Sequence, residues 1–126
     1  MPTVREVMSK DLVTVERAAT VSDAAAFMWA QKVGSALVIE EGRLLGIFTE
    51  RDILKSMTVG ADRGRTMTVR EWMTFNPATI DAEATVGEAL DRMLEGSFRH
   101  LPVMEGDQVI GVVSMRDLSQ SIAGKP

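Results

Sequence analysis

Residues 46–52, Gly46-Ile47-Phe48-Thr49-Glu50-Arg51-Asp52, occur a second time as Gly111-Val112-Val113-Ser114-Met115-Arg116-Asp117. Each copy contains glycine, two apolar β-formers, a hydroxyl residue, two variable positions and aspartate. This order predicts a buried strand that turns into a helix. Thr49 or Ser114 would be the N-cap, and Asp52 or Asp117 would lie at the third helical position.

The start of such a helix suits two different tasks. Its backbone N–H groups and partial positive charge favour a phosphate, and a neighbouring carboxylate can accept hydrogen bonds from a ribose diol. The pattern Thr/Ser-x-x-Asp is also an ordinary capping box, which needs no ligand. Taken alone the pattern favours capping, and the duplication is what favours a ligand site.

The duplication extends over nearly the whole chain. Residues 4–57 align without a gap on residues 69–122, a shift of 65 positions (69 minus 4). Two copies are too few for a solenoid. We therefore expect a pseudo-symmetric pair of small domains over residues 1–60 and 61–126, with residues 58–67 as a polar linker.

Both repeats predict the same α+β order of elements. Capping boxes at Thr3 and Thr68 start a helical turn, and a short strand follows over residues 12–15 and 78–80. Hairpins over 36–49 and 101–114 lead to closing helices over 51–57 and 116–122. Pro77 is expected to hold Asn76 in an extended conformation.

The longest helix of each repeat starts after Thr20 or Thr85 and is expected to end near Gly34 or Gly96. Apolar residues at helical spacing predict one buried stripe on each helix. The stripe residues are Val21, Ala24, Ala25, Met28 and Trp29 in the first copy, and Val86, Ala89, Leu90, Met93 and Leu94 in the second.

Composition limits the classes of function. The chain has 126 residues, 45% apolar and 25% charged, with a net charge of -4 and no cysteine. Disulfides, thiol catalysis and cysteine-bound zinc are excluded, and no basic face for nucleic acid is expected. No signal peptide or membrane-spanning run is visible, so we expect a cytoplasmic protein that does not contact membranes.

The element order, with Gly-h-h-Thr/Ser-x-x-Asp at the last junction, resembles the CBS domain, the family named for cystathionine β-synthase. The resemblance covers residues 3–122 and predicts a stand-alone tandem pair, called a Bateman module. Further supporting phrases are Val33-Gly34-Ser35-Ala36-Leu37-Val38, Ile53-Leu54 and Arg99-His100-Leu101-Pro102-Val103.

The resemblance implies two β-α-β-β-α repeats joined through their sheets in pseudo-twofold symmetry, with two clefts. Such modules bind adenine nucleotides or related adenosyl ligands and regulate a partner. It implies AMP, ADP or ATP ahead of S-adenosylmethionine or NAD, and a homodimer formed through helices. The particular ligand, the number of filled clefts and the regulated protein are not indicated by the sequence.

The resemblance also implies roles for particular residues. The aspartates would hold ribose hydroxyls, the hydroxyl residues and helix amides would hold phosphate, and two arginines would neutralise phosphate charge. Aliphatic side chains and backbone would contact the base. One cleft would use Thr49, Arg51, Asp52, Val13, Thr14 and Leu37, and the other Ser114, Arg116, Asp117, Ala78, Thr79 and Leu101.

Other readings of these residues stay open. His100 could contact a phosphate or be structural, and the two arginines could form surface ion pairs. One histidine without cysteine predicts no metal site. No Ser/His/Asp arrangement is discernible, so no enzyme is expected. A ligand-free dimerisation module is the alternative function.

The methionines and tryptophans could be core or a partner surface. We expect Met28 and Met93 in the core, and some of Met57, Met73 and Trp72 in a dimer contact.

Overall fold

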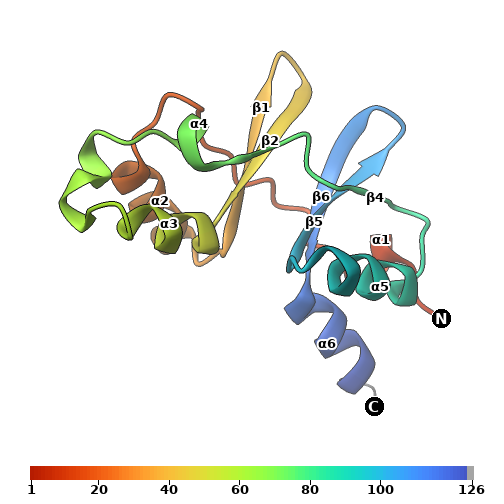
Figure 1. Cartoon of the computed structure of the whole chain (residues 1–126). Helices are drawn as coiled ribbons and strands as arrows, with labels where there is room; N and C mark the ends of the chain where they lie inside the picture. Colours follow the sequence, from red (N-terminus) through yellow and green to blue (C-terminus); the bar gives the residue numbers. More distant parts are fainter. Residues whose placement is uncertain (125–126) are drawn as a thin grey trace. The chain divides into compact units, whose positions relative to one another are not determined.

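The computed structural model describes residues 1–124 and divides into two compact units (Figure 1). Unit 1 joins Met1–Leu12 to the residues from Ala78 onward, and unit 2 is Val13–Pro77. Each unit contains a three-stranded sheet and helices. The mixed α+β fold built from two repeats is confirmed.

Unit 2 is built on the sheet β1-β2-β3, in which neighbouring strands are antiparallel. Thr14 adds an isolated bridge parallel to Leu37 of β1. Its elements are α2 (Val21–Gln31), β1 (Ser35–Glu40), β2 (Arg43–Thr49), α3 (Glu50–Met57), the 3-10 helix η1 (Ala61–Arg65), α4 (Val69–Trp72) and β3 (Thr74–Phe75).

Unit 1 repeats this plan on the sheet β4-β5-β6. β4 is parallel to β5, β6 is antiparallel to β5, and Ser9 bridges Val112 of β6 in antiparallel orientation. Its elements are α1 (Val4–Val7), β4 (Ile80–Asp81), α5 (Val86–Gly96), β5 (His100–Glu105), β6 (Gln108–Ser114) and α6 (Met115–Ala123).

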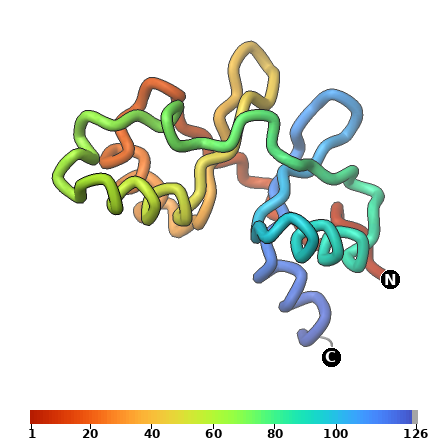
Figure 2. The backbone as a smooth tube through the Cα atoms, viewed as in Figure 1, coloured from red at the N-terminus to blue at the C-terminus, as the bar shows by residue number. Residues whose placement is uncertain are grey.

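The two repeats exchange their first segments. Ser9, from the first repeat, pairs with β6 of the second, while β3 of the second repeat pairs with β2 of the first. Figure 2 shows the red N-terminal segment running beside the blue C-terminal part of the chain. The expected boundaries, 1–60 and 61–126, follow the sequence repeat, whereas the compact units change at residues 12/13 and 77/78.

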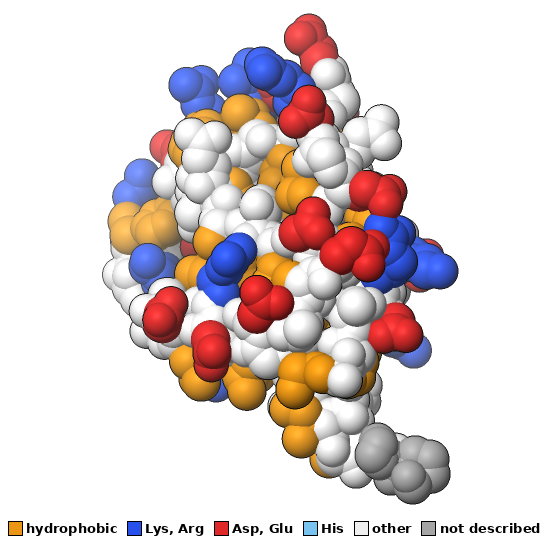
Figure 3. Space-filling view, turned by 90° about the vertical axis from the view of Figure 1, so that its right-hand side faces the viewer, with side chains coloured by type: hydrophobic (Ala, Val, Ile, Leu, Met, Phe, Trp, Pro, Cys, Tyr) orange, Lys and Arg blue, Asp and Glu red, His pale blue; other side chains and the backbone are white. Residues whose placement is uncertain are grey.

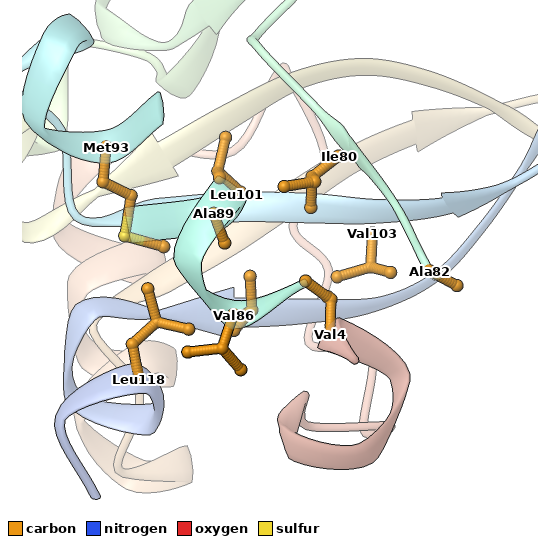
Figure 4. Packing of buried hydrophobic residues seen from close by; sticks show 10 residues of the cluster. Val4, Ile80, Ala82, Val86, Ala89, Met93, Leu101, Val103 and Leu118 are labelled. Atoms are coloured by element: carbon orange, nitrogen blue, oxygen red, sulfur yellow. The ribbon is translucent and has the colours of Figure 1, made fainter. Parts of the chain in front are cut away.

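Each unit has its own hydrophobic core, and each core includes residues of an exchanged segment. Val4 of α1 lies in the core of unit 1, where side chains from α5, β5 and α6 converge on it (Figure 4). Val69 of α4 holds the equivalent place in unit 2. Both valines are 0% exposed, and burying a valine side chain stabilises a fold by about 1.5–3 kcal/mol.

The long helices end differently from the expectation. Lys32 and Ser97 take the left-handed C-cap conformation, with φ of 60° and 58°, so Gly34 and Gly96 are not the terminating residues. Gly96 is the last residue of α5, and a Cβ there would lie 2.0 Å from the Phe98 ring. Glycine at this position therefore makes room for Phe98.

The short strands also differ. Residues 12–15 form only the Thr14 bridge, and β4 begins at Ile80 rather than at residue 78. The expectation for Asn76 is wrong, because its φ is 47°, a left-handed value that asparagine tolerates better than most residues. The hairpin glycines Gly42 and Gly106 have positive φ values, 76° and 60°, which glycine adopts without steric cost.

The buried stripe of each long helix is narrower than predicted. Val21, Ala24 and Met28 are buried on α2, but Trp29 is 86% exposed. The equivalent residue of α5, Leu94, is 62% exposed, while Met93 is buried. The core assignment of Met28 and Met93 is confirmed. Met73 also belongs to the core, at 7% exposure, and not to an exposed contact surface.

Candidate functional site

In unit 2 the motif ends in a complete capping box at the start of α3. The Thr49 N–H donates to Asp52 Oδ2 at 2.8 Å, and the Asp52 N–H donates to Thr49 Oγ1 at 3.4 Å. The Thr49 hydroxyl also donates to Asp52 Oδ2, at 3.2 Å. The hydroxyl of Thr49 therefore donates and accepts within the cap itself.

The same capping box starts α6 in unit 1, with one difference. The Ser114 N–H donates to Asp117 Oδ2 at 2.8 Å, and the Asp117 N–H donates to Ser114 Oγ at 3.0 Å. The hydroxyl of Ser114 accepts this bond and keeps its own proton for another partner. In both boxes the bonds that the aspartate accepts end on Oδ2, and a carboxylate has a second oxygen that can also accept. Capping and ligand binding are therefore compatible roles for these aspartates.

The amides at these helix starts are mostly engaged. The N–H of Glu50 donates to the Gly34 carbonyl, and the equivalent N–H of Met115 donates to the Arg99 carbonyl. With the two capping bonds, the N–H groups of the N-cap residue and of the first and third helical residues have partners in the protein at each helix start. A bound phosphate would rely on side chains more than the resemblance implied.

The glycines of the motif serve packing. A Cβ on Gly46 would lie 2.7 Å from the Thr74 carbonyl oxygen and 2.9 Å from Met73 Sδ. A Cβ on Gly111 would lie 2.6 Å from both the Ser9 carbonyl oxygen and Met8 Sδ. The exchanged segments pass directly over these glycines, so the motif combines a packing position with a cap.

Asp52 is the more buried of the two aspartates, at 8% exposure, whereas Asp117 is half-buried. Burial raises the pKa of Asp52 above its ordinary value, because the charged carboxylate loses hydration. The hydrogen bonds from Thr49, and then the positive charges of Lys55 and Arg51, act in the opposite direction on this pKa.

Of the residues expected to contact the base in unit 2, Thr14 presents an exposed backbone edge. Leu37 N–H donates to the Val13 carbonyl, and Val15 N–H donates to the Leu37 carbonyl. In this parallel pairing the N–H and C=O of Thr14 point away from Leu37, and Thr14 is exposed. The side chains of Leu37 and Leu101 are 0% exposed, so their expected contact with a base would require rearrangement of the interior.

The corresponding edge of unit 1 is different. Ala78 is exposed and Thr79 is half-buried, and the Thr79 carbonyl accepts a hydrogen bond from Arg92 Nη1. Pro102, which is equivalent to Leu37, has no N–H to donate. Strand pairing therefore begins at Ile80, opposite Val103.

The remaining candidate residues lie around the caps. His100 is half-buried and faces Ser114 across the β5–β6 ladder. Its equivalent in the first repeat, Ser35, faces Thr49 and is 8% exposed. Ser35 was not predicted as a site residue, although its place 65 positions before His100 was a usable signal. Arg51 and Arg116 are exposed at the second helical position of α3 and α6.

Asp117 also lines a shallow, open hollow on unit 1. Its other lining residues are Pro2, Val7, Gln120, Ser121 and Gly124. Among residues 1–124, no cluster of three or more His, Cys, Asp or Glu side chains could hold a metal ion. Within the same residues, every helix is too short or too polar to cross a bilayer.

Comparison with known proteins identifies the family. The CBS domain family matches the chain twice, over residues 4–58 and 69–124, so the chain belongs to the CBS-domain family. An uncharacterized 17.7 kDa protein of Acidianus ambivalens is 33% identical over 94% of this chain and 72% of its own length. The Arabidopsis thaliana protein CBSCBSPB2 is also 33% identical, but the chain spans only 21% of its length.

Solved structures agree with this assignment. A CBS-domain protein of Burkholderia ambifaria has a TM-score of 0.92 at 28% identity, covering 98% of this chain and 96% of the other. The CBS pair of protein MJ0100, in complex with 5′-methylthioadenosine and S-adenosyl-L-methionine, has a TM-score of 0.88 at 26% identity, covering 100% and 99%. The hexameric CBS-CP12 protein of bloom-forming cyanobacteria has a TM-score of 0.87 at 26% identity, covering 94% and 66%.

Proposed function

We propose that this CBS pair is a regulatory module that binds an adenine nucleotide and transmits its occupancy to a partner protein. The observation that carries the proposal is the duplicated strand-to-helix junction, where a carboxylate is held in place by its cap through one oxygen. The other oxygen can accept hydrogen bonds from a ribose diol. The adenosyl ligands in the MJ0100 complex support this class of ligand.

The proposed contacts differ between the two ends of the nucleotide. Asp52 or Asp117 holds the ribose, and the exposed edge of Thr14 offers one N–H and one C=O to the base. Adenine presents an amino donor next to a ring-nitrogen acceptor, which matches such an edge. Arg51 and Arg116 neutralise phosphate charge, and AMP, ADP and ATP are preferred over S-adenosylmethionine or NAD.

The test is calorimetry on single aspartate variants with adenosine, AMP, ADP and ATP. In the unit that binds the nucleotide, Asp→Ala (Asp52 or Asp117) should weaken all four ligands by similar factors, because all share the ribose. The loss of a hydrogen bond to a charged acceptor costs about 1.5–3 kcal/mol. Arg51→Ala or Arg116→Ala should weaken ATP more than adenosine, and the difference should shrink at high salt.

Because the aspartates are also caps, the design needs a control for lost stability. Glu88→Ala removes the capping carboxylate at the same position of α5, where the Thr85 N–H donates to Glu88 Oε1 at 2.9 Å. It should lower the melting temperature and leave affinity unchanged. If both aspartate variants behave in the same way as Glu88→Ala, the motif is only a capping box.

The alternative function, a dimerisation module without a ligand, is favoured by a separate observation. Large apolar side chains are exposed at equivalent positions of both repeats, as Trp29 with Leu94 and Met57 with Ile122. A thermal-shift panel of adenine nucleotides separates the two functions, since a ligand that binds only the native state raises its melting temperature. If no nucleotide raised the melting temperature, the ligand-free dimerisation module would be the supported function.

A further inference from the structure

The two repeats differ in how they use one backbone carbonyl. Thr14 and Thr79 are equivalent residues, and both precede the long helix of their repeat. The carbonyl of Thr14 takes part in none of the hydrogen bonds recorded within residues 1–124. The carbonyl of Thr79 accepts a hydrogen bond from the guanidinium of Arg92. The Thr14 carbonyl can therefore accept a hydrogen bond from a ligand, whereas the Thr79 carbonyl already accepts one from Arg92.

Two substitutions between the repeats cause this difference. Pro102 replaces Leu37, so the amide that fixes residue 13 in unit 2 has no counterpart in unit 1. Arg92 replaces Phe27, which is 43% exposed and has no donor on its side chain. Arg92 lies on α5, and its hydrogen bond to Thr79 spans thirteen residues of sequence. Both changes fall within unit 1, and together they close its edge.

We propose that the Arg92 guanidinium occupies the Thr79 carbonyl in place of a purine base. Each chain then binds a single nucleotide, at the Thr14–Asp52 site of unit 2. This inference rests on the proposed function. The amino group of adenine and the guanidinium of Arg92 are both donors, and they compete for the same carbonyl.

The half of the unit 1 site that would hold the ribose is intact. Ser114 and Asp117 form the same capping box as Thr49 and Asp52, and Asp117 is the less buried aspartate. The two sites therefore differ at the base and not at the sugar. Removing Arg92 should open a second site without any change to its carboxylate.

The experiment counts AMP sites per chain by calorimetry. The natural protein should bind one AMP, and Asp52→Ala should weaken this binding at least tenfold, whereas the capping control Glu88→Ala should leave it unchanged. Arg92→Phe, which copies the residue of the first repeat, should raise the stoichiometry to two. Arg43→Ala, another exposed arginine, controls for the change in net charge and should still give one.

A reciprocal variant keeps the test independent of effects on unit 1. Phe27→Arg places the same competing donor beside Thr14 and should weaken AMP at least tenfold, with an unchanged melting temperature. Two AMP per natural chain, or one per chain in Arg92→Phe, would overturn the inference while leaving the proposed function in place. An absence of AMP binding in every variant would overturn both.

Discussion

Asp52 shows how one residue carries two opposed effects. Its carboxylate accepts the hydrogen bonds that cap α3, yet it is only 8% exposed, and burial raises its pKa. An aspartate with a raised pKa binds its proton more readily in the folded state than in the unfolded state. Its contribution to stability is therefore fully present below the ordinary value of 3.8 and is lost as the pH rises through the raised value.

Asp52→Asn keeps an acceptor for the Thr49 N–H and removes the buried charge. We expect the stability of this variant, relative to the natural protein, to increase as the pH rises from about 4 to about 7. Asp117→Asn is the matched control, because it removes a capping charge that is less buried and worth about 0.3–1 kcal/mol at a helix start. Urea unfolding at a series of pH values measures both. Equal losses of stability in the two variants at pH 7 would contradict the role given to burial.

The residue scale also shows the limit of the sequence pattern. The two capping boxes were predicted correctly at Thr49/Asp52 and Ser114/Asp117, because the pattern is local and acts over three residues. The hydrogen bond from Arg92 to Thr79 could not be predicted. It depends on the direction of the long Arg92 side chain and on the backbone N–H that Pro102 lacks. The spacing of apolar residues, which predicts helices and strands, gives no information on either.

Among the elements, the exchanged segments explain why glycine starts both copies of the motif. Gly46 lies under residues 73–74 and Gly111 lies under residues 8–9, and in each case a Cβ would come within 2.7 Å of a backbone carbonyl oxygen. Gly46→Ala and Gly111→Ala should each destabilise the fold by about 1–3 kcal/mol, the usual cost of overpacking. Thermal or urea unfolding checks this expectation.

Gly87 is the matched control for these glycines. It lies inside α5, and a Cβ there would meet nothing nearer than 3.4 Å. Gly87→Ala should stabilise the protein by about 0.5–1 kcal/mol, because alanine is the better helix former. If Gly46→Ala, Gly111→Ala and Gly87→Ala had similar effects on stability, the exchanged segments that pass over Gly46 and Gly111 would not be the reason for glycine there.

Element type was more predictable than element pairing. The long helices and both hairpins follow from apolar spacing and turn glycines. The pairing of β3 with β2, and of Ser9 with β6, joins residues far apart in sequence. Two-residue strands carry no periodicity, so their partners could not be read from the chain.

At the scale of the molecule, large apolar side chains are exposed at equivalent positions of the two repeats. Trp29 is 86% exposed and Leu94 62%, and Met57 and Ile122 are 50% and 60% exposed. Figure 3 shows hydrophobic side chains, in orange, gathered near the C-terminal end, with acidic and basic side chains interspersed elsewhere on that face. Exposed patches of this kind mark interaction surfaces. We propose that a second copy of the chain covers them.

We expect light scattering to give a dimer at tens of micromolar. Trp29→Lys should weaken self-association by about tenfold or more, since a buried tryptophan is among the strongest contributors to an interface. Phe75→Ser, at a residue that is 47% exposed in β3, is the control and should not change the dimer. A monomer at these concentrations would contradict the proposal.

The reciprocal exchange of first segments also has a consequence during translation. Residues 13–77 can complete unit 2 as soon as they leave the ribosome, whereas Ser9 must wait for Val112. At about 5–20 residues per second, this wait lasts roughly 5–20 s. During that interval the N-terminal segment can pair with the β6 strand of a neighbouring nascent chain. An mRNA that carries closely spaced ribosomes would then yield domain-swapped dimers, in which each chain completes the sheet of the other.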